Sequence, residues 1–516
     1  MMKNNRRFLT LILALLMCLS AFTSASAEEK IEIKWLGYYT SNIPVAEDTY
    51  AEKLIEEYFG VELTPVTGVT AENIDTVIAS GDILDVTCYA SYLDNNFTYM
   101  YDQAMIREFP GEWLWEYYPT GMKIYSDFLG AEFFEEGNHL VDGKCLYTPF
   151  TTTTTTSGYC LVYRKDWLDN LGMTEPTTLD EFHDMLYAFT YNDHDGNGID
   201  DTYGIDAIWA WMGLWPVYGA FGFVNDSNAG QYYLQDNGTV KYTTVQESYK
   251  QALAIIEQWY QEGIIDPECI TDDRSAVRTK WANGTVGAMV DSQTWYYSNR
   301  GSSSIAAMVQ EAYGENACEV MGPLTSQYGD GKVYSAVKFP NISSNRALCF
   351  SDNATDEQII AVLKILEGMA ADNELMMKIL FGEEGIDYVF TESGQLQVLP
   401  HVSIEYMASK GISDTFYGYG ATDPYMATIT FSEQDKAFNE KCDSWPRLYW
   451  ANNFTTVNNE AYNQYSEEVR KLEKEFYHNV LLGIVDLEDE WDNYVANMNK
   501  AGLDKIIAEY ETLLAK

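Results

Sequence analysis

Between residues 31 and 89, short apolar strands alternate with amphipathic helices, and this pattern limits the choice of fold. The predicted strands are Ile31–Leu36, Val61–Thr64 and Asp85–Tyr89. The apolar face of the first predicted helix carries Leu54, Ile55, Tyr58 and Phe59, and that of the second carries Ile74, Val77 and Ile78. Strands and helices at this spacing form βαβ units and a parallel sheet. The sequence therefore predicts an α/β fold.

The ends of these strands are candidate positions for a ligand. In open α/β sheets, ligands bind beyond the carboxyl ends of the strands. Tyr38 and Tyr39 follow the first predicted strand, and Tyr89 ends the third. We therefore expect these three tyrosines near a cleft, with a place in the core as the alternative for each of them.

The N-terminus has the pattern of a signal peptide over residues 1–27. Three cations between residues 3 and 7 precede an apolar run at 8–19, and the small residues Ala25–Ala27 form a cleavage site. Cys18 follows a methionine, whereas a lipid-modified cysteine usually follows a small residue. No later stretch has the apolar length of a membrane helix. We expect cleavage after Ala27, no lipid anchor and a secreted protein.

Composition and charge exclude several classes of protein. Hydrophobic residues make up 46% of the chain and aromatic residues 14%, which indicates a folded protein. The formal net charge of −46 argues against binding to nucleic acid or to an anionic membrane, both of which need a basic surface. The cysteines after Cys18 are scattered and form no CxxC pair. We expect buried thiols, and neither a disulfide framework nor a zinc site.

Two stretches in the middle of the chain carry a family resemblance. RKDWLDNLGMTEPTTLDEF (Arg164–Phe182) contains a capping-box spacing at Thr178 and Glu181, and DHDGNGIDDTYG (Asp193–Gly204) follows it. Both stretches resemble the family 1 extracellular solute-binding proteins, in particular the oligosaccharide-binding branch with alginate- and aldouronate-type binders. Other matching stretches occur in the same order: Asn73–Val86, Ile255–Glu268, Asn283–Met289, Phe381–Tyr388 and Trp491–Ile507.

The resemblance implies a periplasmic-binding-protein-like fold with two discontinuous lobes and a ligand cleft between them. We expect residues 28–150 and 322–415 in the first lobe, and residues 155–318 and 416–516 in the second. The six consecutive threonines at 151–156 are interpreted as a strand that crosses between the lobes, with a mobile linker as the alternative. The ligand would bridge both lobes and stabilise the closed state.

The stretch that starts at Asp193 has the spacing of an EF-hand calcium loop. Asp193, Asp195 and Asn197 occupy loop positions 1, 3 and 5, the carbonyl of Ile199 occupies position 7 and Asp201 position 9. The glycine at position 6 permits the turn that brings these oxygens together, but position 12 is glycine rather than glutamate. We expect a structural Ca²⁺ ion, and the alternative is a metal-free turn.

Aromatic residues are the candidates for sugar binding, because the apolar faces of sugars stack on electron-rich rings. Trp209 and Trp211 follow the predicted calcium loop, and Trp295 follows an apolar strand. The resemblance places Trp295 at the cleft, and Trp445 in a proline-containing loop is a further candidate. The alternative for each is core packing, which we expect for Trp167, Trp259 and Trp491.

The resemblance implies a carrier rather than an enzyme. The sequence contains no HExxH, GxSxG or GxxxxGK[ST] motif. We expect the monomeric binding component of an ABC importer that captures an oligosaccharide and docks on permease subunits. The alternatives are a secreted polysaccharide-active enzyme and a carbohydrate-binding protein without a permease. Four arginines are candidates for pairing with an acidic sugar, although surface charge is their default interpretation: Arg274, Arg278, Arg300 and Arg447.

Overall fold

The structure is a computed structural model of the chain. It describes residues 30–37, 45–67, 69, 77, 80–90, 97–135, 137, 139–141, 143–150, 159–192, 194, 198–199, 201–210, 212–223, 232–235, 237–296, 304–329, 333–334, 347–413, 416–448, 457 and 459–515. The predicted signal peptide and the threonine run at 151–156 lie outside these residues.

A four-stranded sheet with the order β10-β3-β1-β2 forms the centre of one half of the molecule. Its strands are β1 (Glu32–Leu36), β2 (Glu62–Pro65), β3 (Cys88–Ala90) and β10 (Leu348–Phe350). Strand β1 pairs in parallel with β2 and β3, as the alternation of strands and helices predicts, whereas β10 is antiparallel to β3. A strand from the distant part of the chain therefore completes this sheet.

The residues at its two ends explain the bounds of the first helix, and a short 3-10 helix lies where the third strand was predicted to begin. Helix α2 (Tyr50–Phe59) begins where the Thr49 side chain accepts a hydrogen bond from the backbone of Glu52, and it ends at Gly60, which has a φ of 69°. The predicted third strand was placed too early, because residues Asp82–Asp85 form the short 3-10 helix η1 and β3 begins only at Cys88.

Tyr58, predicted on the apolar face of α2, is exposed and donates a hydrogen bond to Asp372. The other helices of this half are α4 (Phe97–Asp102), α5 (Glu112–Tyr117), α6 (Pro119–Leu129), α7 (Ala131–Glu135), α14 (Asp356–Ala371), α15 (Asn373–Phe381), α16 (Ile404–Lys410) and α17 (Tyr425–Thr430). A hairpin of β11 (Tyr388–Phe390) and β12 (Leu396–Val398) follows α15.

A three-stranded sheet with the order β7-β4-β8 lies in the other half. Strand β4 (Tyr159–Arg164) is antiparallel to both β7 (Ala288–Ser292) and β8 (Cys318–Met321). Helix α9 (Leu179–Tyr191) begins with the predicted capping box, in which Thr178 and Glu181 bond each other's backbone. The parallel arrangement predicted from residues 31–89 therefore applies to β1, β2 and β3, and this second sheet is antiparallel.

The remaining elements surround this second sheet and its neighbouring helices. The helices are α8 (Lys165–Asn170), α10 (Trp215–Ala220), α11 (Glu247–Gln261), α12 (Arg274–Asn283), α13 (Ile305–Tyr313), α18 (Glu433–Asp443), α19 (Glu460–Leu481), α20 (Leu487–Lys500) and α21 (Leu503–Leu514). The 3-10 helices are η3 (Ile208–Ala210), η4 (Met212–Leu214), η5 (Thr243–Val245), η6 (Pro267–Ile270) and η7 (Gln293–Trp295). Two short pairs of strands complete the set: β5 (Tyr232–Leu234) with β6 (Val240–Tyr242), and β9 (Val333–Tyr334) with β13 (Arg447–Leu448).

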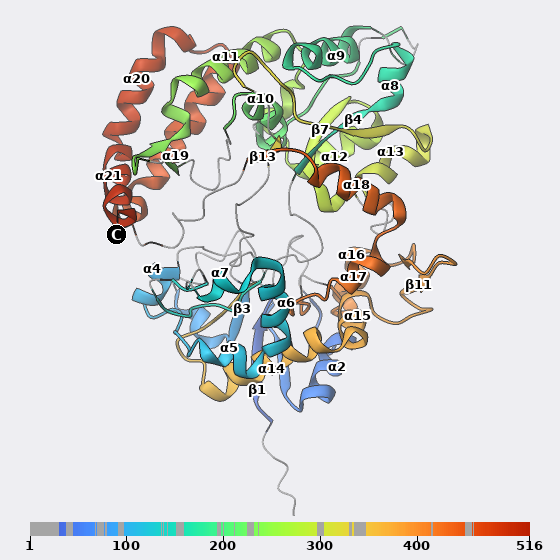
Figure 1. Ribbon diagram of the computed structural model, residues 1–516, viewed down its shortest axis with the longest axis vertical. Helices are drawn as coiled ribbons and strands as arrows, with labels where there is room; N and C mark the ends of the chain where they lie inside the picture. The colour runs from blue at the N-terminus through green and yellow to red at the C-terminus, as the bar shows by residue number, and fades with distance from the viewer. Residues whose placement is uncertain are drawn as a thin grey trace, which may run out of the picture.

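The buried side chains form two large cores, and each combines two separate stretches of chain. The first core contains residues between Ile33 and Phe150 and between Ala347 and Ala421. The second core contains residues between Cys160 and Leu324 and between Phe431 and Tyr510. In Figure 1 the elements of the first core lie together at the bottom and those of the second at the top. The molecule therefore has the two-part α/β organisation that the sequence predicts.

Several residues that the sequence assigns to packing are buried in these cores. The seven cysteines after Cys18 are buried and free: Cys88, Cys145, Cys160, Cys269, Cys318, Cys349 and Cys442. Trp167, Trp259 and Trp491 all belong to the second core, as expected. Over the described ranges, no helix has both the length and the apolar character that a membrane span requires.

Candidate functional site

The tyrosines predicted at the strand ends do not form a described site. Tyr38 and Tyr39 lie outside the described residues. Tyr89 lies in β3 with 1% of its surface exposed, and its ring packs in the first core. Its strand is covered by neighbouring strands on both edges, since β3 lies between β10 and β1. Tyr89 is therefore a core residue in this structure rather than a surface for a ligand.

Trp209 is an exposed indole on a tightly held turn. Its backbone has φ 54° and ψ 35°, and Ala210 follows with a φ of 70°, so two successive residues other than glycine are left-handed. Such backbone costs about 1–3 kcal/mol per residue and persists only where the surroundings impose it. The neighbours Ile208 and Ala210 are fully buried, whereas Trp209 is 38% exposed. The turn thus presents one aromatic side chain to solvent.

Close packing of the backbone helps to impose this turn. The Trp209 N–H donates to the carbonyl oxygen of Asp272 at 2.8 Å, and the Tyr477 hydroxyl donates to the carbonyl oxygen of Ala210 at 2.8 Å. Gly213 passes so close that a Cβ atom there would lie 2.4 Å from the carbonyl oxygen of Asp206. Only glycine fits this position without moving the turn.

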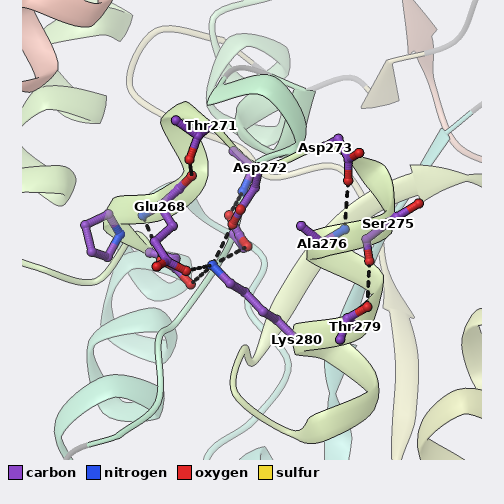
Figure 2. Close-up of polar contacts among 12 residues, drawn as sticks. Glu268, Thr271, Asp272, Asp273, Ser275, Ala276, Thr279 and Lys280 are labelled. Carbon is purple, nitrogen blue, oxygen red and sulfur yellow. Dashed lines mark hydrogen bonds and ion pairs between the residues drawn. The ribbon is translucent and has the colours of Figure 1, made fainter.

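Beside this turn, Lys280 of α12 reaches into a cluster of carboxylates (Figure 2). Its Nζ atom lies 2.5 Å from Asp272 Oδ2, 2.6 Å from Asp266 Oδ2, 2.9 Å from Glu268 Oε2 and 3.6 Å from Asp206 Oδ2. The three aspartates are buried, and they offer oxygens within 4.8 Å of one another, a spacing that would suit a metal ion. The ammonium group of Lys280 already lies among these oxygens. The cluster therefore has its own cation.

The charges in this cluster shift the pKa of two of its members. Burial, followed by the charge of Asp266, raises the pKa of Asp206 to about 7. Burial alone would lower the pKa of Lys280, but its hydrogen bonds to Asp266, Asp272 and Glu268 raise that pKa above the ordinary value. At neutral pH Lys280 therefore keeps its charge, while Asp206 is close to its own titration midpoint.

Trp295 lies in η7, directly after β7, and is half-buried against the second core. The guanidinium carbon of Arg278 lies 4.4 Å from the centre of the indole, in cation–π geometry. Arg278 Nε also donates to Asp291 Oδ2 at 2.7 Å, and Arg274 Nε lies 3.7 Å from Asp291 Oδ1. Both arginines thus pair with a fully buried aspartate, which corrects their default interpretation as surface charge.

Helix α12 connects the two tryptophans. It carries Arg278, which stacks on Trp295, and Lys280, which binds the carboxylates next to Trp209. Trp445 is a third half-buried indole, at the end of α18, and a Cβ atom at Gly322 would lie 3.3 Å from its Nε1 atom. Trp211 and Arg300 lie outside the described residues, and the side chain of Arg447 is not described.

The predicted calcium loop is described only in part. Asp193, Asp195 and Asn197 lie outside the described residues. Gly198 has a φ of 75°, the left-handed conformation that a sharp turn at loop position 6 needs. Ile199 and Asp201 are exposed, so the carbonyl and carboxylate expected as ligands are on an accessible segment.

Neighbouring elements hold both ends of this loop. His194 stacks on Trp167 with ring centres 3.6 Å apart, and Asn170 donates to its carbonyl oxygen at 3.2 Å. At the other end, the Thr202 hydroxyl donates to the carbonyl oxygen of Phe189 at 2.8 Å. The loop is therefore fixed to α8 and α9 at positions that do not use its expected ligands.

The sequence is similar to a family of bacterial proteins and to several known relatives. The family model for the bacterial extracellular solute-binding protein matches residues 126–318. Lipoprotein LipO of Bacillus subtilis is 27% identical over 401 residues, which cover 74% of this chain and 73% of that protein. The polygalacturonan/rhamnogalacturonan-binding protein YtcQ of the same organism is 21% identical over 509 residues, covering 95% and 93% of the two chains. Over residues 126–318 the chain therefore resembles the bacterial extracellular solute-binding proteins.

Solved structures share the fold of this chain. The ABC-transporter substrate-binding protein FusA of Streptococcus pneumoniae, in complex with kestose, has a TM-score of 0.69 at 17% identity and covers 94% of this chain and 98% of its own. An EF-hand mutant of FusA with fructo-nystose has the same TM-score and identity. An HMO-binding solute-binding protein from Bifidobacterium longum infantis has a TM-score of 0.71 at 14% identity, covering 94% and 98%. The fold is therefore that of the periplasmic-binding proteins, as predicted.

One expectation needs revision, and one feature of the structure was not expected. The sequence was expected to carry no lipid anchor, and the similarity to a protein named Lipoprotein LipO does not support this expectation. The sequence reading also missed the Lys280 cluster, whose members come from four places in the chain. The available signal was the dense acidic stretch from Asp266 to Asp273, which lies between α11 and α12 and is followed by one lysine on α12.

Proposed function

We propose that this chain is an extracellular solute-binding protein that captures an oligosaccharide outside the cell and presents it to the permease of an ABC importer. The observation that carries the proposal is the exposed indole of Trp209 on a rigid turn, with the half-buried indole of Trp295 anchored to the same helix α12. Indole faces suit the apolar faces of sugar rings. The names of the relatives, which refer to polygalacturonan, kestose and HMO, support a carbohydrate.

We further propose that the two cores are the two lobes and that the ligand binds between them. The supporting observation is that each core combines an earlier and a later stretch of chain. The expected boundaries, 28–150 with 322–415 and 155–318 with 416–516, fit most of this division. Leu324 packs in the second core, and Phe416 packs in the first, so we propose crossings after both of these residues.

We propose a structural Ca²⁺ ion in the loop at 193–201. The left-handed Gly198 and the loop ends held by α8 and α9 fit a turn that gathers oxygen ligands, and one similar solved structure is described as an EF-hand mutant of FusA. Asp193, Asp195, Asn197 and Asp201 would supply side-chain oxygens and Ile199 its carbonyl. When bound, the ion would neutralise these carboxylates and fix the loop between α9 and the turn that carries Trp209.

The proposed location is outside the cell, after removal of the N-terminal segment. Two forms of processing lead there: cleavage after Ala27, or lipid attachment at Cys18 with cleavage before it. The intact mass of the protein recovered from its native host separates them. Cleavage after Ala27 gives an unmodified protein that starts at Glu28, whereas lipid attachment gives a heavier chain that partitions with membranes and that Cys18→Ser would release.

The proposed role as a carrier is tested by screening glycans for stabilisation and then for turnover. Oligogalacturonate, kestose and human-milk-type oligosaccharides serve as probes, because a ligand that binds only the folded state raises the melting temperature. At least one probe should stabilise the protein and be recovered intact after prolonged incubation with it. Steady release of shorter sugars would identify an enzyme and overturn the proposal, and so would the absence of stabilisation by every probe of a broad glycan panel.

A further inference from the structure

We infer that Lys280 is the positioning residue for Trp209, holding the left-handed turn that presents this indole to the ligand. The inference rests on the proposed function, because it assigns the contact with the sugar to Trp209. Lys280 would not touch the ligand, since it acts through Asp272, Asp266 and Asp206 on the segment that precedes and carries the tryptophan. The geometry supplies each step.

The first step is a direct connection from the ammonium group to the turn. Lys280 Nζ lies 2.5 Å from the carboxylate of Asp272, and the carbonyl oxygen of the same residue accepts the Trp209 N–H at 2.8 Å. Asp272 thus binds Lys280 through its carboxylate and accepts the Trp209 N–H through its backbone carbonyl oxygen. A shift of Asp272 away from Lys280 would move the hydrogen-bond acceptor of Trp209.

The second step is a connection to the segment at 205–207, which leads into the turn. The backbone N–H of Asp266 donates to the carbonyl oxygen of Ile205 at 3.0 Å, and the backbone N–H of Ala207 donates to Asp206 Oδ1 at 2.7 Å. Both aspartates face Lys280 Nζ, at 2.6 and 3.6 Å. The ammonium group therefore fixes the turn from its preceding residues as well as from Asp272.

The third step concerns charge. Without Lys280, three buried aspartates would have oxygens within 4.8 Å of one another, with Glu268 beside them and no cation of the cluster between them. Like charges at this spacing repel strongly in a poorly solvated site. The segments that carry them would separate or take up protons, and the two left-handed residues would lose the contacts that compensate their strain.

The test measures the turn and the ligand separately. Lys280→Met keeps much of the side chain and removes the charge. We expect amide hydrogen exchange across residues 205–213 to become at least about tenfold faster, because the Trp209 N–H loses a fixed acceptor. We expect binding of oligogalacturonate or kestose to weaken about tenfold. Asp272→Asn keeps the backbone acceptor, so it should also speed the exchange and weaken glycan binding, each by a smaller factor. This variant replaces Lys280→Met in the test if Lys280→Met does not fold.

A double-mutant cycle separates positioning from general stability. Trp209→Ala should weaken binding by about 30-fold or more, and Lys280→Met should add little once the indole is absent. Lys410→Met is the matched control, because Lys410 lies 2.5 Å from the buried Asp387 and 3.1 Å from Glu383 in the other half of the molecule. It should lower stability and leave both the exchange at 205–213 and the affinity unchanged.

The inference is overturned if Lys280→Met resembles Lys410→Met, with lower stability but unchanged exchange at 205–213. Fully additive effects of Lys280→Met and Trp209→Ala on affinity would overturn it as well. If the wild-type protein binds neither probe, the proposed function fails for these glycans, while the exchange measurement still decides whether Lys280 holds the turn.

Discussion

Asp206 is a fully buried carboxylate that faces Asp266, Asp272 and Lys280. Burial and the charge of Asp266 raise its folded pKa from 3.8 to about 7. Because the pKa of this carboxyl is higher in the folded state than in the unfolded state, its ionised form is the less favourable one in the folded protein. Its contribution to the free energy of unfolding therefore falls as pH rises from about 4 to about 7 and stays low at higher pH. The pH dependence of stability should therefore carry a signature of this one residue.

We expect Asp206→Asn to be more stable than the wild type at pH 8, by roughly 1–4 kcal/mol, with the difference disappearing near pH 4. The asparagine oxygen can still accept the hydrogen bond from the Ala207 N–H. Denaturant unfolding at a series of pH values measures the difference. A wild-type protein that is more stable than Asp206→Asn at pH 8 would show that the buried carboxylate is not destabilising.

Asp387 provides a control of opposite sign. Although burial opposes its ionisation, hydrogen bonds from Lys410, the backbone of Glu383 and Tyr406 lower its pKa. Its contribution is present above its unfolded pKa and is lost as pH falls through the lower folded pKa. Asp387→Asn should therefore destabilise the protein at neutral pH, where Asp206→Asn stabilises it.

Trp295 tests the assignment of the sugar-binding surface in the second half of the molecule. It is half-buried with Arg278 on one face, so its removal should cost some stability as well as a ligand contact. We expect Trp295→Ala to weaken binding of a stabilising glycan by about 30-fold or more, measured by calorimetric titration. Normal affinity in a folded Trp295→Ala protein would remove this residue from the proposed site.

The matched variant for comparison is Trp259→Ala, because Trp259 is a core residue on α11. Its truncation should lower stability by about 3–5 kcal/mol through the cavity that it leaves. The remaining folded protein should bind the glycan normally. This pair of variants distinguishes a ligand contact from a packing residue that affects binding only through stability.

At the scale of elements, two parts of the molecule are rich in carboxylates: the loop at 193–201, which we expect to bind Ca²⁺, and the Lys280 cluster, which we expect not to bind it. The loop should bind Ca²⁺, which would stabilise the folded state by about 2.7 kcal/mol at one hundred times its dissociation constant. Excess chelator should therefore lower the melting temperature, and Asp195→Ala should abolish that sensitivity. Identical melting with calcium and with chelator would contradict the proposed ion.

The Lys280 cluster supplies the control for this experiment. Because Lys280 already neutralises its carboxylates, Asp206→Asn should keep the full response to calcium and chelator. If Asp206→Asn abolished the response and Asp195→Ala did not, the cation would belong to this cluster instead of the loop.

Local signals predicted the elements that depend on nearby residues. The periodicity around β1, α2 and β2 and the capping box at Thr178 reappear in the structure because each is set within a few residues. The third strand was predicted to start three residues too early, since Asp85 ends η1, and Val86 and Thr87 lie between η1 and the start of β3 at Cys88. The pairing of β10 with β3 depends on residues far apart in the chain, and periodicity does not encode it.

The same distinction applies to the candidate site. A local cluster of tryptophans made Trp209 a candidate, and its place after an apolar strand together with the family resemblance made Trp295 one; their contact with a ligand stays a prediction. The burial of Tyr89 and the left-handed turn at Trp209 result from packing against distant segments. Lys280 meets carboxylates from residues 206, 266, 268 and 272 only after folding, so its role was not visible as a motif.

At the scale of the whole molecule, the two cores correspond to the two lobes of the proposed carrier, which would respond to a ligand bound between them. Each core has its own sheet and its own buried side chains, and the described chain changes core between residues 150 and 160, 324 and 347, and 421 and 431. Such connections allow hinge motion without unfolding either core. A ligand that contacts both cores would favour the closed arrangement by its extra contacts.

Small-angle X-ray scattering of the purified protein, with and without a saturating glycan chosen by its stabilising effect, tests capture between the two lobes most directly. The account predicts that the radius of gyration decreases when the glycan binds, and that Trp209→Ala needs about 30-fold more glycan for the same decrease. Melting curves of the same samples show whether each protein is folded. Saturated binding with no change in the radius of gyration would contradict capture by closure of the two lobes.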